Sequence, residues 1–264
     1  MIVRFSTIII LVMHFSIAVA QTGIGNAVQV EKYQKCISLV EEDASSALTL
    51  ARNWYIEGGG IASQHCEALA LYNQDNFKEA ATLFETIIDD LVTGKGTSDF
   101  AFDNKYLLRV QLNYLAGLAW SSTSELDKAY TAFSAAISGM NHKSIYAYDI
   151  FIERGLVQML RKDPENAIDD FTRALEIDSE KVDAFLYRAE AYRKINQHLK
   201  ARLDLNAGLS IEPNQPDLLF ESGVNYRMQN NDEKALGEWE KLNEKYPNTH
   251  WQELIKKNIE IIVQ

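Results

Sequence analysis

Apolar and small residues recur along this chain with the period of a helix, and the helical segments themselves recur about every 34 residues. A fixed period of this length is typical of stacked helix pairs, so the pattern predicts an all-α solenoid. The small residues that keep this spacing form two series, Gly155, Ala189 and Gly223 in the first helix of each pair, and Ala167, Ala201 and Ala235 in the second.

Each repeat places its small and large side chains in complementary positions. Small residues let the two helices of a pair approach closely, and a large residue four places after each alanine of the second series fills the remaining space. Pro213 and Pro247 each close a second helix, because proline cannot donate a hydrogen bond within a helix interior. The large residues are Phe171, Leu205 and Trp239.

These residue types at fixed offsets resemble the tetratricopeptide repeat family. The resemblance implies a right-handed α-solenoid of stacked antiparallel helix hairpins, ended by a capping helix over 249–264. Residues 93–103 form an insertion that is expected to make a loop or to lengthen the next helix. The expected repeats span approximately 28–60, 61–92, 110–141, 148–181, 182–215 and 216–248.

In the family, first helices line a concave groove, and the resemblance carries this role to the matching positions here. The groove is then mainly apolar and suits a protein or peptide partner. An alternative stays open, in which the C-terminal helix or the insertion near Phe100 and Phe102 covers the groove. The expected partner-binding residues are Tyr114, Leu118, Ile152, Leu156, Met159, Leu186, Arg193, Phe220, Val224 and Arg227.

The N-terminal segment, 1–20, has the pattern of a secretory signal peptide. Arg4 precedes an apolar run over 8–17, and Ala18-Val19-Ala20 supplies small residues for cleavage before Gln21. The run is shorter than the roughly 20 residues that cross a bilayer, although an uncleaved anchor remains an alternative. The mature domain, 21–264, is expected in the periplasm or outside the cell, without a membrane span.

The chain has two cysteines, Cys36 and Cys66. An even number of cysteines in an exported chain favours a disulfide. The cysteines of a redox Cys-x-x-Cys motif lie within one helical turn, whereas these two lie far apart along the chain. The pair is therefore predicted to be a structural disulfide.

Charge and dispersed polar residues argue against several functions. The formal net charge is −11, and loss of Arg4 with the leader makes it −12, which disfavours nucleic acid. Acidic pairs such as Asp89-Asp90 and Asp169-Asp170 are expected on solvated helix faces. His65 adjoins Cys66, but neighbouring side chains on a helix point about 100 degrees apart, so the two are not expected to form a catalytic pair. We expect no catalytic residue, no metal site and no cofactor.

Together these features predict a noncatalytic exported scaffold or adaptor that binds a protein or peptide partner in its groove, in cell-envelope assembly. The alternative is a structural subunit of an envelope complex that self-associates into a homo-oligomer through the same groove.

Overall fold

The computed structural model describes residues 23–24, 27–95, 101–102, 104–140 and 144–263. The expected signal peptide, 1–20, and Gln21 lie outside the described residues. Contacts between residues divide the chain into two compact units, Met1–Asn141 and His142–Gln264. The described part of the first unit contains three helix pairs, α2 (Ala27–Glu42) with α3 (Ala44–Ile56), α4 (Gly60–Asn73) with α5 (Phe77–Thr93), and α6 (Lys105–Ser122) with α7 (Leu126–Ser138).

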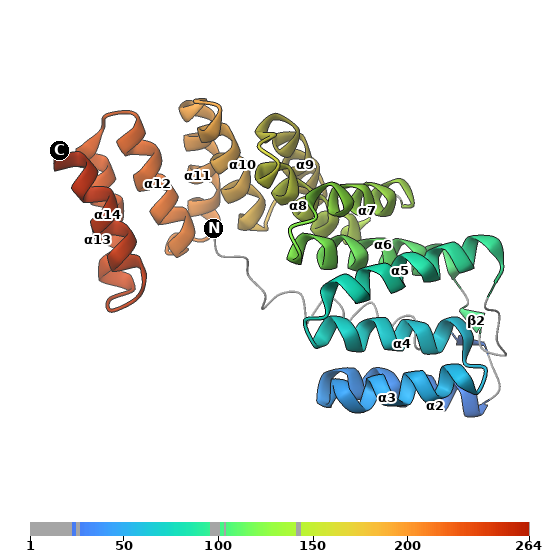
Figure 1. Cartoon of the computed structure of the whole chain (residues 1–264). Helices are drawn as coiled ribbons and strands as arrows, with labels where there is room; N and C mark the ends of the chain where they lie inside the picture. Colours follow the sequence, from blue (N-terminus) through green and yellow to red (C-terminus); the bar gives the residue numbers. More distant parts are fainter. Residues whose placement is uncertain (1–22, 25–26, 96–100, 103, 141–143, 264) are drawn as a thin grey trace. The chain divides into compact units, whose positions relative to one another are not determined.

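The described part of the second unit contains three further helix pairs and a single last helix (Figure 1). Within each pair the two helices pack on each other, and the first helix of the next pair in the same unit packs on the second helix of the pair before it. The all-α solenoid predicted from the sequence is confirmed. The elements are α8 (Ile145–Leu160) with α9 (Pro164–Ile177), α10 (Val182–Lys194) with α11 (His198–Ile211), α12 (Pro216–Met228) with α13 (Asp232–Lys245), and α14 (Trp251–Val263).

A two-stranded sheet in the first unit accompanies the helices. Strand β1 (Gly23–Ile24) pairs antiparallel with β2 (Ala101–Phe102), with Gly23 opposite Phe102. The strand β2 belongs to the expected insertion, whose first residue, Thr93, ends α5. Phe100 lies outside the described residues. The helical period could not indicate this pairing, because two residues are too few to show a strand pattern.

The close approach of paired helices depends on glycine in three repeats. A Cβ atom added to Gly117 would lie 2.6 Å from the Phe133 ring, and one added to Gly155 would lie 2.5 Å from the Phe171 ring. An added Cβ at Gly223 would overlap the Trp239 indole in the same way. Real Cβ atoms do not come this near to other heavy atoms, so each large ring requires a glycine opposite it.

The middle repeat of the second unit shows how the two positions compensate. There Ala189 is tolerated because the facing residue is Leu205 rather than an aromatic residue. We expect Gly155→Ala to lower the free energy of unfolding by about 1–3 kcal/mol through overpacking, even though alanine is the better helix former. Phe171→Leu in the same chain should recover part of that loss, and urea unfolding of both single variants and the double variant measures the coupling. Additive effects would contradict direct contact between these positions.

Two buried ion pairs repeat at the interval of one repeat. Arg154 in α8 donates to Asp170 in α9 from Nε at 2.9 Å and from Nη2 at 2.6 Å. Arg188 in α10 donates to Asp204 in α11 in the same two-pronged way, at 2.8 and 2.7 Å. The expectation that Asp170 lies on a solvated face is therefore wrong. Asp170 is only 3% exposed, and the charge of Arg154 compensates its burial.

A disulfide joins the first two helix pairs. Cys36 in α2 and Cys66 in α4 are bonded, 30 positions apart in sequence, and both residues are fully buried. The predicted disulfide between these cysteines is confirmed. The bond connects the first helices of two successive pairs, so it fixes how those two pairs stack.

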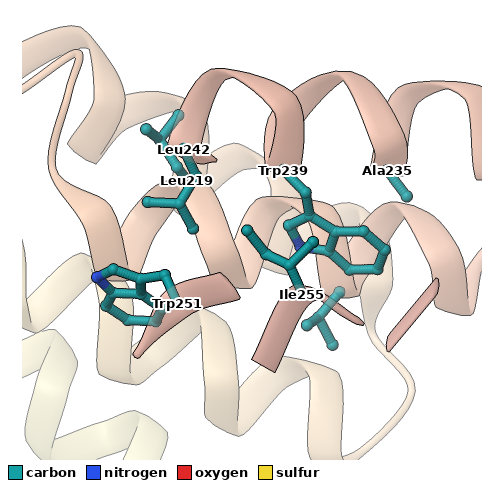
Figure 2. Close-up of a cluster of buried hydrophobic side chains, with 7 residues drawn as sticks. Leu219, Ala235, Trp239, Leu242, Trp251 and Ile255 are labelled. Atoms are coloured by element: carbon teal, nitrogen blue, oxygen red, sulfur yellow. The ribbon is translucent and has the colours of Figure 1, made fainter. Parts of the chain in front are cut away.

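The last helix, α14, covers the final hairpin of the second unit. Trp251 and Ile255 of α14 join a buried cluster with Leu219 of α12 and Trp239 and Leu242 of α13. Figure 2 shows Ile255 directed toward the Trp239 ring. The opposite side of α14 is polar, since Glu253 and Lys257 are exposed and form an ion pair at 2.7 Å. The helix α14 therefore has one side packed on α12 and α13 and one polar side.

Candidate functional site

The first helices of the second unit, α8, α10 and α12, lie side by side. Tyr148 in α8 donates a hydrogen bond to Asp183 in α10 at 2.5 Å, and Arg193 in α10 forms an ion pair with Glu221 in α12. We call the side chains that these three helices direct away from their second helices the first-helix face. The expected partner-binding residues of the second unit belong to these helices.

The structure buries half of the expected partner-binding residues. In the first unit, Tyr114 and Leu118 of α6 are 7% and 3% exposed, and the Tyr114 ring lies 5.9 Å from the Phe133 ring. Among the other expected residues, those buried are Ile152, Leu186 and Val224, whereas Leu156, Met159, Arg193, Phe220 and Arg227 are partly exposed.

Neighbouring elements explain the burial on the first-helix face. Leu186 lies in one hydrophobic cluster with Leu218 of the next repeat, and Val224 lies in another with Trp251 of α14. The Phe220 ring lies 5.4 Å from the Trp251 ring. The last helix therefore contacts the first-helix face at Phe220. Leu156 and Met159 of α8 are the apolar members that remain partly accessible.

Carboxylates crowd the first-helix face between α8 and α10. Burial raises the pKa of Glu153 from its ordinary value of 4.5 to about 7, and the negative charges of Asp149 and Asp183 raise it further in the same direction. Burial also raises the pKa of Asp149, against the opposing effect of Lys181, whose Nζ lies 3.8 Å from Asp149 Oδ1. Three carboxylates therefore lie close together, and Lys181 forms an ion pair with one of them, Asp149.

We expect this crowding to make stability depend on pH. Because the folded pKa of Glu153 lies above 4.5, the folded chain binds more protons than the unfolded chain between about pH 4.5 and pH 7. The free energy of unfolding then falls as the pH rises through this window. Glu153→Gln should raise the melting temperature at pH 8 and leave it nearly unchanged at pH 4.5. The exposed Glu165→Gln is the matched control, and equal effects of both variants at pH 8 would contradict the assignment.

A second charged group connects α10 and α12. The Arg193 guanidinium donates to Glu221 through Nε and, at 3.2 Å, through Nη2. Burial raises the pKa of Glu221, while Arg193 opposes this rise. The neighbouring Glu190 has a pKa of about 7, raised first by burial and then by the charge of Glu221. The positive charge of Arg193 thus compensates two carboxylates, those of Glu190 and Glu221.

The sequence does indicate these acids, by a regular spacing that the apolar pattern did not take into account. Asp149, Asp183 and Asp217 occupy the same place in three successive repeats. Arg227 also belongs to this face, and its buried Nε has no hydrogen-bond partner among the described residues. The accessible first-helix face is therefore less apolar than expected, with charged side chains next to Leu156 and Met159.

The histidine and cysteine neighbours in the first unit have separate partners. Tyr33 Oη and His65 Nδ1 share a hydrogen bond of 2.8 Å, whereas Cys66 is bonded to Cys36. Burial lowers the pKa of His65 to about 4, so this ring is neutral at pH 7. The disulfide leaves no thiol beside the ring. In the described part of the chain, no group of three or more His, Cys, Asp or Glu side chains is arranged to hold a metal ion.

Several solved structures have a fold similar to that of this chain. A tetratricopeptide repeat protein from Parabacteroides merdae superposes with a TM-score of 0.67 at 16% identity, over 89% of this chain and 86% of that one. PilF of Pseudomonas aeruginosa gives a TM-score of 0.63 at 14% identity, over 87% and 97%. YrrB, described as a tetratricopeptide repeat protein with an unusual peptide-binding site, gives 0.55 at 18%, over 85% and 97%.

These likenesses and the stacked hairpins define the class of this protein as a helical repeat protein of the solenoid type. The family model for the tetratricopeptide repeat matches residues 217–249, which cover α12, α13 and the turn after them. Residues 217–249 thus carry a tetratricopeptide repeat, and the fold of the chain resembles that of tetratricopeptide repeat proteins. No curated protein matches it by sequence. Within the described residues, no helix has the length and apolar character needed to cross a membrane.

Proposed function

We propose that this protein is a noncatalytic scaffold or adaptor, exported through its leader, that holds a protein or peptide partner during cell-envelope assembly. Tetratricopeptide repeat proteins generally bind protein or peptide partners rather than catalyse reactions. The fold fits this role, since a stack of hairpins offers a continuous surface along its first helices. The peptide-binding site named for YrrB supports the same class of partner here.

The observation that carries the proposal is the first-helix face of the second unit. Leu156 and Met159 are partly exposed there, close in sequence to Glu153, whose charge the protein itself compensates poorly. An apolar side chain of a partner packs on Leu156 and Met159, and a basic side chain next to it neutralises the carboxylates. Leu186 and Val224 are buried in hydrophobic clusters and Phe220 packs against one of them, so these three side chains offer less surface to a partner.

Export is supported by the leader and by the disulfide. A disulfide buried between α2 and α4 is typical of proteins that fold in an oxidising compartment. Mass spectrometry of the protein isolated from cells should give a mature chain that begins at Gln21, recovered from the periplasm or the medium. A chain that retains residues 1–20 and stays in the cytoplasm would exclude export.

Site-specific photocrosslinking in intact cells tests the binding face. A photoreactive amino acid at Met159 or Leu156 should capture a discrete protein partner, whereas the same group at Arg173, exposed on the second helix α9, should not. The variant Met159→Glu should reduce crosslinking from position 156, because it removes an apolar side chain on which the partner packs. Substitution of Leu186 or Phe220 is a poorer test, since a buried charge would unfold the repeat. Equal capture at 159 and 173 would exclude this face as the site.

A further inference from the structure

A groove separates α13 from α14 in the second unit, apart from the first-helix face. Its volume is about 900 Å³, within the range of ligand-binding clefts. Its apolar residues come from both helices, Leu236 and Trp239 from α13 and Ile255 and Ile259 from α14. The remaining lining residues are Glu240, Asn243, Gln252, Lys256 and Glu260.

One end of this groove is closed by a hydrogen bond. Gln252 Nε2 donates to Asn243 Oδ1 at 3.2 Å, next to the turn that joins α13 to α14. Away from the turn, Leu236 is 40% exposed, although its neighbour on the same helix, Trp239, is buried. The groove therefore has a floor that is already packed and an apolar edge that is accessible to a partner.

The length and the walls of the groove fit a short helix. The lining residues of α14 span 252–260, which is about 13 Å along a helix axis, or between two and three turns. A partner helix of this length places apolar residues at i, i+3 or i+4, and i+7 on Leu236, Trp239 and Ile259. The outer side of α14, with Glu253 and Lys257, is polar and does not offer such a surface.

The charged residues that line the groove are two glutamates and Lys256, so the lining has a net charge of −1 and favours a basic partner. Glu240 stands on the wall formed by α13 and Glu260 on the wall formed by α14, and both are exposed and without an ion pair among the described residues. Lysine or arginine on both sides of an apolar stripe would pair with these two carboxylates. A second copy of this chain fits less well, because each copy carries a net charge of −11.

We propose that the groove between α13 and α14 is a second docking site, which binds an amphipathic helix of another protein whose apolar stripe is flanked by basic residues. This site does not depend on the first-helix face. The two surfaces would let one molecule hold two partners at once, which is how a scaffold differs from a simple binding module.

Three fluorescent 15-residue helical peptides test this proposal with the full mature chain. They share leucine at i, i+3, i+4 and i+7 and carry lysine, glutamate or glutamine beside this stripe. By fluorescence anisotropy, the lysine peptide should bind at least tenfold more tightly than the glutamate peptide. The double variant Glu240→Lys with Glu260→Lys should reverse this preference, and Leu236→Glu should weaken binding of the glutamine peptide at least tenfold.

A matched control separates local from overall charge. Glu233→Lys with Glu244→Lys changes the net charge equally at exposed positions of α13 outside the groove lining, and should leave the preference for lysine intact. Met159→Glu, on the first-helix face, should also leave peptide binding unchanged. Hydrogen exchange should show protection over 236–243 and 252–260 when the lysine peptide is bound.

Four results would overturn the proposal. They are equal binding of the lysine and glutamate peptides, a control variant that reverses the preference as strongly as the groove variant, protection confined to other helices, and a peptide-independent dimer that Leu236→Glu abolishes. The last result would assign the groove to a second copy of the chain. Because the groove variants leave the first-helix face unaltered, failure here leaves the proposed adaptor role to be judged by its own crosslinking test.

Discussion

Replacement of Arg188 by methionine is expected to lower the free energy of unfolding by about 3–5 kcal/mol. The side chains of Arg188 and Asp204 are 18% and 8% exposed, so loss of the arginine leaves a buried carboxylate without its partner. Arg188 Nη1 also donates to Thr172 Oγ1 of α9 at 3.0 Å, so the same change removes a contact between two successive hairpins. Urea unfolding monitored by circular dichroism measures the loss.

The decisive comparison is with the variant that removes both charges. Arg188→Met with Asp204→Leu replaces the ion pair by apolar side chains of similar volume, and such replacements are often neutral or stabilising. The double variant should therefore recover most of the loss. A single variant that loses less than about 1 kcal/mol would show that the ion pair behaves like a screened surface pair.

Reduction of the Cys36–Cys66 disulfide is expected to destabilise the first unit by about 3–4 kcal/mol. The bond closes a loop between residues 30 positions apart, and its removal restores chain entropy to the unfolded state. At about 2–4 °C for each kcal/mol, the melting temperature of the first unit should fall by roughly 6–16 °C. Thermal unfolding with and without a reducing agent measures the shift.

The control for reduction is the variant Cys36→Ala with Cys66→Ala. It should melt near the temperature of the reduced protein, because both cysteines are fully buried and alanine leaves little polar surface there. The reducing agent should not change its melting temperature. A reduced wild-type chain that melts at the oxidised temperature would show that stacking of α2 and α4 does not need the bond.

The sequence predicted the fold well because the same packing contact between a small and a large residue recurs in several repeats. Gly155 with Phe171 and Gly223 with Trp239 are independent copies of one contact, and the structure has both. The disulfide was predictable for a simpler reason, since two cysteines in the chain allow one intramolecular pairing. Because the contact recurs, the repeats together predict the helix pairing more strongly than any single repeat does.

The candidate site was harder to predict because the position of a side chain in a repeat does not fix its exposure. Leu186 and Val224 occupy places that the family turns toward its groove, yet Leu218 and Trp251 bury them. The carboxylates of Asp149, Glu153 and Asp183 come together only when α8 and α10 lie side by side.

The sequence by itself determined the helix pairs, the places where they approach closely and the covalent link between the first two pairs. These features depend on local periods and on residue size, which a linear pattern contains. Tertiary structure alone decided the buried ion pairs, the crowded carboxylates and the groove between α13 and α14. Each of these depends on desolvation, and desolvation is a property of neighbours that are distant in sequence.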